Sequence, residues 1–475
     1  MIVIDLALVA AVIAALAGLL WNRLFHFRWT LIIVPDILVL LLFVRLLLKP
    51  FVWTILPAMI AAGGIAVYSL FRLRKLRLPL AGAPSTVRRF AFIRKLAAGL
   101  IACLLAVIIA APPILLPVFS LERPEGDYAI GTSLYHWTDE SRLEPVTDDP
   151  SDHRELTVQV WYPADSASVA GLQHAVYLPE WNETAPLLAK QYHLPSFLFS
   201  HLQAVHTHGY SNAPVSADLS RYPVILFSHG LPGLYASDTF LFEALASSGY
   251  IVVSINHTYY SIASVLQDGS VATVQDHAFP SPLDWDANDS LIADVWAKDA
   301  SFVLDRLAQL DKDPSFPIAG RLDWNRIGMA GHSFGGANAV QMLYTDDRVK
   351  AGVNLDGTMF GTGAGSGPLG KPLLLLLSKR SDPNEVPTDS ELKQSNITRA
   401  QFEKLVSEVL KREHNALAAS GSRSMTIKGA DHLAFTDLYR FSPLLPILTG
   451  TGSPDAVHRR ISAEVLTFFN EQLKK

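Results

Sequence analysis

The hydrophobic positions divide the chain into two parts with different patterns. Four nearly unbroken apolar stretches occupy about residues 2–21, 30–48, 51–70 and 96–118. Each approaches or reaches the roughly 20 residues that a helix needs to cross the hydrocarbon of a bilayer. Buried core helices of a soluble protein would show polar faces, and these stretches do not. We therefore expect residues 1–118 to form a transmembrane region with about four helices.

From about residue 127 the pattern changes to short apolar runs that end in small or polar residues, which is typical of buried parallel strands. These runs lie at 154–163, 222–230, 250–257, 326–333, 350–357, 372–378 and 424–432, and helical patterns lie at 238–248, 291–310, 334–345 and 455–473. Alternating strands and helices predict an α/β fold, a mostly parallel sheet with helices on both faces. Residues 119–475 are expected to form this second domain, with insertions at about 171–220 and 380–423.

The same two parts of the chain, residues 1–118 and 119–475, also differ in net charge. Residues 1–118 hold 12 Lys and Arg against two acids, a net charge of +10, and the whole chain carries −5, so residues 119–475 carry −15. An acidic domain repels phosphates, which excludes nucleic acid as a partner. The cationic segment 71–95 is expected in the cytoplasm by the positive-inside rule. Everything after about residue 119 is then extracytoplasmic.

The second apolar stretch contains two charged residues, Asp36 and Arg45. A charge in the middle of a membrane costs about 2.5–3.5 kcal/mol on insertion scales. We expect Arg45 to extend its side chain toward the interface and Asp36 to face another helix.

A candidate nucleophile lies where the run 326–333 meets the helical pattern 334–345. The sequence Gly-His-Ser-Phe-Gly, residues 331–335, fits G-x-S-x-G around Ser333. In this arrangement a sharp strand-to-helix turn exposes the serine oxygen, and small residues two positions before and after it avoid a clash. The alternative is a serine that only caps the helix. The strand before it and the helix after it favour a catalytic Ser333.

A serine nucleophile also needs donors for the oxyanion that forms on its substrate. The amide of Phe334 lies at the N-terminus of the predicted helix and is the first candidate. The loop after the run 222–230 should supply the second, and the amide of Leu231 is the best candidate there. We expect His229, in the same loop, to shape the loop and to take no part in proton transfer.

The base and the acid should follow the serine along the chain. His432 lies in a loop just after a predicted strand, whereas His414 and His458 lie in helical patterns, so His432 is the expected base. Two acids follow strands, Asp356 after the next strand and Asp382 after the one beyond it. Spacing alone leaves these two open.

The motifs in order resemble a known family. "LTVQVWYPAD", "FSHGL", "GHSFGGA", "NLDGTMF" and "DHLAFTD" are similar to segments of the platelet-activating factor acetylhydrolase family of secreted phospholipases A2 and its bacterial relatives, over about residues 120–470. The resemblance implies an α/β-hydrolase fold with a triad of Ser333, Asp356 and His432 and oxyanion donors at Leu231 and Phe334. It also implies metal-independent hydrolysis of short or oxidised acyl esters of phospholipids. The apolar N-terminal part and a glycine-rich stretch at 361–367 depart from that family.

We therefore expect a membrane-anchored serine ester hydrolase without cofactor or metal, from a bacterial source, whose partner is a lipid or another ester substrate. His206 and His208 could begin a metal site, but no further ligands follow at suitable spacing. One alternative is a general carboxylesterase or polyester hydrolase of the same fold. Another is a non-catalytic membrane scaffold or sensor.

Overall fold

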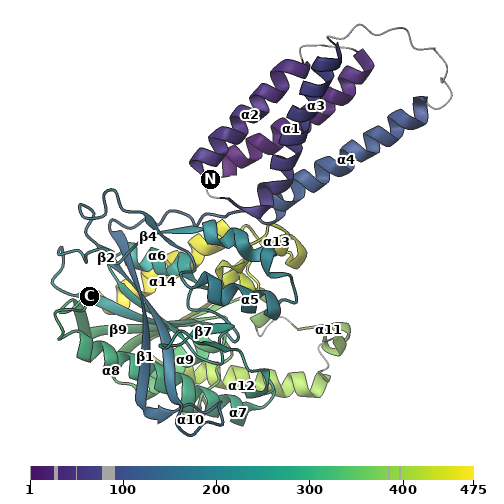
Figure 1. Cartoon of the computed structure of the whole chain (residues 1–475). Coiled ribbons are helices and arrows are strands. Elements are labelled where there is room, and N and C mark those ends of the chain that lie inside the picture. The colour runs from purple at the N-terminus through teal and green to yellow at the C-terminus, as the bar shows by residue number, and fades with distance from the viewer. Residues whose placement is uncertain are drawn as a thin grey trace. The chain divides into compact units, whose positions relative to one another are not determined.

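The computed structural model describes residues 2–25, 30–49, 51–76, 91–382, 386–394 and 397–474. The chain divides into two compact units, drawn in Figure 1. The first comprises Met1–Ser120, Phe197–Val205 and Phe441–Leu444, and the second comprises the remaining residues. Residues 26–29 lie outside the described residues, as do residues 77–90, which include Arg77, Arg88 and Arg89 of the basic segment 71–95.

The first unit is helical. Its helices are α1 (Ile2–Phe25), α2 (Thr30–Leu48), α3 (Leu56–Leu76) and α4 (Ala91–Leu115), and a 3₁₀ turn (Trp53–Ile55) precedes α3. Among the described residues, Trp53–Phe71 and Leu96–Leu115 are long and apolar enough to cross a membrane, and Val3–Leu19 is a shorter apolar helix. These findings support two candidate spans, whereas a region of four spans stays a prediction.

The two charged residues of α2 differ from expectation. Arg45 is 1% exposed, and its Nε lies 3.0 Å from Oδ1 of Asp5 in α1. The prediction that Arg45 extends toward an interface was wrong, because a carboxylate on the neighbouring helix pairs with the guanidinium where it stands. Asp36 is exposed, so the prediction that it faces another helix was also wrong.

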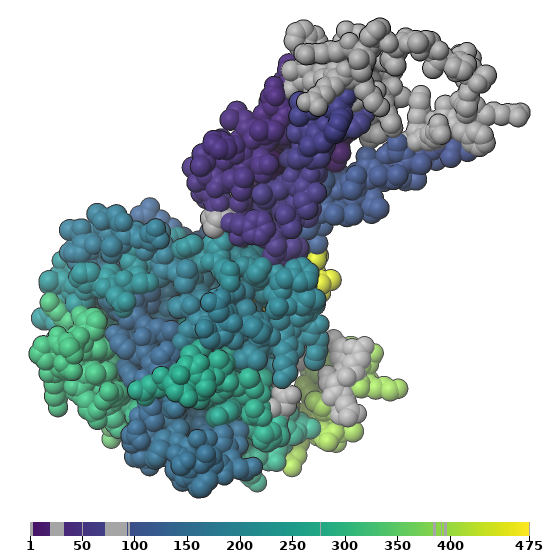
Figure 2. Space-filling view, in the orientation of Figure 1, coloured from purple at the N-terminus to yellow at the C-terminus, as the bar shows by residue number. Residues whose placement is uncertain are grey.

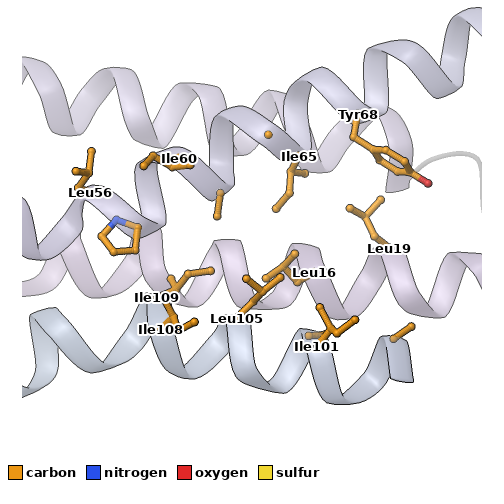
Figure 3. A pocket seen from close by; sticks show the side chains of 15 residues that line it. Leu16, Leu19, Leu56, Ile60, Ile65, Tyr68, Ile101, Leu105, Ile108 and Ile109 are labelled. Carbon is orange, nitrogen blue, oxygen red and sulfur yellow. The ribbon is translucent and has the colours of Figure 1, made fainter. Parts of the chain in front are cut away.

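An apolar pocket of about 740 Å³ lies among α1, α3 and α4 (Figure 3). Leu16 of α1, Ile65 of α3 and Leu105 of α4 point into it from three sides, and Tyr68 contributes the one hydroxyl among its labelled side chains. The packing of this helical unit therefore leaves a space that only apolar groups would fill favourably.

Within the described residues of the second unit, the main sheet has ten strands in the order β12-β11-β10-β9-β5-β6-β2-β1-β4-β3. The strands are β1 (Ala129–Leu143), β2 (His153–Ala164), β3 (His174–Val176), β4 (His206–Ser211), β5 (Tyr222–Ser228), β6 (Ile251–Asn256), β9 (Leu322–His332), β10 (Val349–Leu355), β11 (Leu373–Leu377) and β12 (Arg423–Thr426). The six strands from β12 to β6 are parallel to one another, and β2 joins them antiparallel. A separate hairpin consists of β7 (Ala263–Val265) and β8 (Val271–Thr273).

Helices cover both faces of the parallel strands, so the predicted α/β fold is confirmed (Figure 1). On one face α9 (Phe334–Thr345) packs on β5, β9 and β10, and α8 (Ala297–Leu310) packs on α9. Buried Val303 of α8 belongs to the same core as Val224 and Leu226 of β5. On the other face α6 (Thr239–Ser247) and α14 (Pro454–Leu473) pack on β6, β9 and β10, and the rings of Phe227 and Phe242 are in contact. A π-helical turn (Ile292–Trp296) connects α7 (Trp285–Leu291) to α8.

The described residues of both segments expected as insertions include exposed and buried positions, and the space-filling view shows part of them at the surface (Figure 2). The first contains β3, α5 (Trp181–Gln191), a 3₁₀ segment (Ser196–Ala204) and β4. The second contains a 3₁₀ turn (Lys379–Ser381), α11 (Asp389–Gln394) and the amphipathic α12 (Arg399–Ala416). The remaining elements are α10 (Thr362–Ser366), α13 (Leu444–Thr449) and 3₁₀ turns at Asp276–Ala278, His432–Phe435 and Asp437–Arg440. The glycine-rich stretch 361–367 thus contains a helical turn.

Candidate active site

Ser333 occupies a strained turn between β9 and α9. Its φ and ψ are 53° and −120°, a left-handed conformation that non-glycine residues adopt at a cost of about 1–3 kcal/mol and mostly at functional sites. A Cβ on Gly331 would lie 2.1 Å from the carbonyl oxygen of Gly335, and a Cβ on Gly335 would lie 2.0 Å from that of Ser228. No residue larger than glycine fits at either position, which is the close packing that the G-x-S-x-G pattern predicts.

His432 contacts Ser333 directly. It begins the 3₁₀ turn His432–Phe435, six residues after β12 ends at Thr426, so the predicted strand 424–432 is shorter than expected. Its Nε2 lies 2.9 Å from Ser333 Oγ, and its Nδ1 lies 2.7 Å from Oδ2 of Asp356. The His432 side chain is 44% exposed, so a substrate can approach it. The imidazole can accept the serine proton at Nε2 while Nδ1–H donates to the carboxylate.

Asp356 is held at the carboxyl end of β10. Its backbone N–H donates to the carbonyl of Leu376, and one carboxylate oxygen accepts the amide of Ser378. Its φ is 59°, which turns the chain sharply after the strand. Burial raises the pKa of this carboxyl, but the hydrogen bonds from His432 and Ser378 outweigh burial, and the pKa lies below its usual value. Asp356 is therefore the ionised partner of the imidazole.

The other candidates for base and acid lie elsewhere. Asp382 accepts a hydrogen bond from the hydroxyl of Thr426 at 2.8 Å. His414 is on the exposed side of α12. His458 in α14 is buried, stacks on Phe240 at 3.8 Å between ring centroids, and contacts the carbonyl of Thr436. Of the two acids that spacing left open, only Asp356 reaches the imidazole.

One residue of this site, His332, was not identified as a functional residue from the sequence. His332, the residue before the serine, lies with Nε2 2.9 Å from the backbone carbonyl of His432, to which Nε2–H can donate. Burial lowers the pKa of His332 to about 3, so its ring stays neutral. His332 thus ties the nucleophile turn to the loop that carries the base. The position of His332 inside the G-x-S-x-G motif was visible in the sequence. Its hydrogen bond to His432 was not, because the two residues are 100 positions apart.

The two expected oxyanion donors lie next to the serine. Phe334 is the first residue of α9, where a helix leaves its amides without a partner within the helix. The loop that carries Leu231 approaches from the other side, because a Cβ on Gly230 would lie 3.2 Å from Ser333 Cβ. Within the described residues, the structure gives neither the Leu231 nor the Phe334 amide a hydrogen-bond acceptor.

Aromatic side chains surround the donor side of the site. Phe334 belongs to a buried cluster with Trp296, Phe360 and Tyr260, and Leu231 packs against this cluster. The rings of Phe334 and Trp296 meet edge to face at 5.0 Å between centroids. Low polarity beside the donors strengthens their interaction with a developing negative charge.

The histidines considered for a metal have other partners. His206 and His208 lie in β4, and His208 Nδ1 is 2.8 Å from a carboxylate oxygen of Glu243. In the part of the chain that the structure describes, no group of three or more His, Cys, Asp or Glu side chains is arranged to hold a metal ion.

The lowered pKa of Asp356 predicts a difference in acid stability between the natural chain and Asp356→Asn. The unfolded chain binds a proton at this aspartate near pH 3.9, whereas the folded chain does so only at lower pH. The stability that ionised Asp356 contributes is therefore present above pH about 4 and is lost as the pH falls, by at most about 1.4 kcal/mol per pH unit. Melting temperatures measured from pH 5 to pH 3 should fall more steeply for the natural chain than for Asp356→Asn. Parallel curves would contradict the assignment.

Comparisons with known proteins identify the family of this chain. A family model described as "Platelet-activating factor acetylhydrolase, isoform II" matches residues 119–280 and 315–452. A platelet-activating factor acetylhydrolase from Cavia porcellus is 30% identical over 169 residues, which are 32% of this chain and 38% of that protein. A probable 1-alkyl-2-acetylglycerophosphocholine esterase from Arthroderma benhamiae is 28% identical over 148 residues, which are 30% of this chain and 34% of that protein. The chain thus spans about a third of the length of these curated relatives.

Among solved structures, a ferulic acid esterase from Streptomyces cinnamoneus is similar with a TM-score of 0.56 and 27% identity. The similarity covers 75% of this chain and 93% of that one. The expectation of an α/β-hydrolase fold is confirmed by this similarity and by the sheet described above.

Proposed function

This chain belongs to the platelet-activating factor acetylhydrolase isoform II family, and on that premise we propose that it is a serine ester hydrolase acting on short-chain or oxidised acyl esters of phospholipids. The observation that carries the proposal is the series of two hydrogen bonds that joins Ser333, His432 and Asp356. Side chains at these separations are those that acyl transfer requires.

In the proposed mechanism, Ser333 Oγ attacks the ester carbonyl while His432 Nε2 accepts its proton. The carbonyl oxygen becomes an oxyanion that accepts hydrogen bonds from the amides of Leu231 and Phe334. Collapse of this intermediate breaks the ester C–O bond, and His432 returns the proton to the leaving alcohol. A water molecule then releases the acid from Ser333 by the same steps, while Asp356 orients the imidazole and stabilises its protonated form.

A panel of substrates tests the proposed specificity. The purified full chain in detergent is assayed with 1-alkyl-2-acetyl-glycerophosphocholine, a phosphatidylcholine with two long chains, 4-nitrophenyl acetate and a short aliphatic polyester, with Ser333→Ala as the blank. The proposal expects the acetyl-phospholipid to have the highest kcat/KM and the long-chain lipid the lowest. Hydrolysis of the simple ester and the polyester alone would reject the phospholipid substrate.

The same panel tests the second candidate, a general carboxylesterase or polyester hydrolase. The similarity to a ferulic acid esterase, which covers 93% of that protein, favours this candidate over other enzyme classes. A kcat/KM that is highest for the simple ester would support it.

We further propose that residues 1–118 anchor the protein with about four membrane helices, and that residues 119–475, with insertions at 171–220 and 380–423, form an extracytoplasmic catalytic domain. The two helices that are long and apolar enough to span a bilayer support the anchor. The basic composition of residues 71–95 supports the orientation. The expectation of a bacterial source stays a prediction.

The proposed orientation predicts which side of the membrane a cysteine in the catalytic domain faces. Cys103 is the one cysteine of the sequence, so Cys103→Ala gives a background without thiols. In that background, an exposed Ser420→Cys should react with a membrane-impermeant maleimide on intact cells. The unaltered Cys103→Ala chain provides the blank. Labelling that requires permeabilised cells would place the domain in the cytoplasm and reverse the proposed topology.

A further inference from the structure

A second Ser-His-Asp series lies in the same unit, and all of it is buried. Ser228 Oγ is 3.0 Å from His257 Nε2, and His257 Nδ1 is 2.8 Å from Oδ2 of Asp299. The three residues are 0% exposed. Because no substrate can reach Ser228, this series has the atoms and spacing of a triad but cannot supply a nucleophile.

Two arginines keep Asp299 ionised. Arg154, itself buried, donates to both carboxylate oxygens of Asp299 at 3.0 and 2.7 Å, and Arg142 donates to one of them at 2.9 Å. Burial raises the pKa of this carboxyl, but the charge of Arg154 outweighs burial and the pKa lies far below its usual value. An ionised Asp299 accepts a hydrogen bond, so His257 must carry its proton on Nδ1.

The remaining contacts hold the His257 ring in one orientation. Asn338 donates an amide hydrogen to Ser228 Oγ at 3.0 Å, so the serine hydroxyl is free to donate to His257 Nε2. The ring stacks on Trp296 with 3.8 Å between centroids and 21° between planes. With both ring nitrogens bonded and one face covered, rotation of His257 would leave buried polar groups without partners, at about 1–3 kcal/mol each.

From His257 the hydrogen bonds continue into the loop beside Ser333. The backbone N–H of His257 donates to Nε2 of His229 at 3.1 Å. The His229 ring therefore carries its proton on Nδ1, which donates to the carbonyl oxygen of Gly230 at 2.6 Å. Burial lowers the pKa of His229 to about 3, so the ring stays neutral and keeps this arrangement.

The peptide group between Gly230 and Leu231, which His229 holds, carries the Leu231 N–H expected to donate to the oxyanion. The carbonyl of Gly230 and the N–H of Leu231 belong to a single peptide group. That group is planar, and in the trans form its N–H points opposite to its carbonyl. Fixing the Gly230 oxygen therefore fixes the direction of the Leu231 N–H, in a loop that lies against Ser333.

We propose that His257 is a positioning residue of the oxyanion hole. Asp299, Ser228 and Trp296 hold the His257 ring, which fixes the position of the His257 backbone N–H. That N–H donates to His229, and His229 in turn holds the peptide that carries the Leu231 N–H. This inference rests on the proposed function, because it assigns Leu231 to the oxyanion. It implies that loss of the His257 ring weakens binding of the transition state and leaves binding of the substrate unchanged.

His257→Phe tests the proposal, since phenylalanine retains the stacking on Trp296 and removes both hydrogen bonds. With 4-nitrophenyl acetate and the full chain, kcat should fall about 10- to 100-fold, which is less than the 10²–10³-fold of losing a donor outright. KM should stay within about threefold. The inhibition constant of a short alkyl trifluoromethyl ketone, whose adduct with Ser333 bears an oxyanion, should rise by the same factor as kcat falls.

Two further variants keep the test decisive. Ser228→Ala removes one bond to the His257 ring, remains small enough to fold, and should show the same pattern with about a 3- to 10-fold change. His201→Phe alters a buried histidine that has no part in the site and controls for general loss of packing. It should lower the melting temperature and leave both kcat and the inhibition constant unchanged.

The outcomes separate this proposal from the proposed function. A natural chain no more active than Ser333→Ala overturns the proposed function and, with it, this inference. An active natural chain together with unchanged kcat and inhibitor binding in His257→Phe and Ser228→Ala overturns the positioning role alone. A kcat loss in these variants that the inhibitor does not share, or that His201→Phe matches, also overturns it.

Discussion

Replacing Ser333 by alanine is expected to lower kcat for ester hydrolysis by about 10⁶-fold. The loss is large because Ser333 supplies the hydroxyl that lies 2.9 Å from Nε2 of His432, and without it the covalent route disappears. What remains is the contribution of the oxyanion donors and of substrate binding. Initial rates with 4-nitrophenyl acetate, measured on the full chain in detergent, provide the comparison.

The control for this variant is Ser315→Ala, since Ser315 is an exposed loop residue whose backbone N–H and hydroxyl donate to Asp313. It should retain the full rate. Retention of near-natural activity by Ser333→Ala would reject the assignment of the nucleophile. Labelling with a serine-directed fluorophosphonate supplies a second measurement, and an absence of any adduct on Ser333 of the natural chain would favour the non-catalytic scaffold.

Replacing Asp356 by asparagine is expected to lower kcat by about 10⁴-fold. The amide can stand in the same place, but it carries no charge to stabilise the protonated imidazole. Its NH₂ group can also donate to His432 Nδ1, which moves the imidazole proton to Nε2, where the serine proton has to be accepted. KM should change little, because Asp356 is only 4% exposed and so offers little surface to a substrate.

Asp382→Asn is the matched comparison, because the sequence offered Asp356 and Asp382 as alternatives. Asp382 accepts a hydrogen bond from Thr426, so its replacement should change kcat by no more than about threefold. If Asp382→Asn lost more activity than Asp356→Asn, the acid would have to be reassigned and the loop of residue 382 would have to move during catalysis.

The local sequence was sufficient to predict those features of the structure that depend on residues close together in the chain. Gly331, Ser333 and Gly335 identify the turn because its geometry involves five consecutive positions. Strands β5, β6 and β11 were also recognisable, since both faces of each are buried and each forms an apolar run in the sequence. Strands β1 and β4 were missed because they are rich in polar residues and pair at the other side of the sheet, beyond β2.

Contacts between distant segments could not be found in this way. Arg45 reads as an isolated charge in an apolar stretch, and only the packing of α1 against α2 brings Asp5 to it. Arg154 and Asp299 form an ion pair in which both side chains are 0% exposed. The hydrogen bond between Arg154 and Asp299 joins residues 145 positions apart, so the hydrophobic pattern of neither segment indicates it.

By itself the sequence determined the class of fold, the turn that exposes Ser333, and the short set of histidines and acids at the carboxyl ends of strands, because hydrophobic periodicity and steric limits at glycine act over a few residues. Strand spacing left Asp356 and Asp382 open, and the family resemblance implied Asp356. The tertiary structure places Oδ2 of Asp356 2.7 Å from Nδ1 of His432. The tertiary structure alone reveals the hydrogen bonds from His332 to the carbonyl of His432 and from the backbone N–H of His257 to His229, since the order of strands in the sheet sets which loops become neighbours.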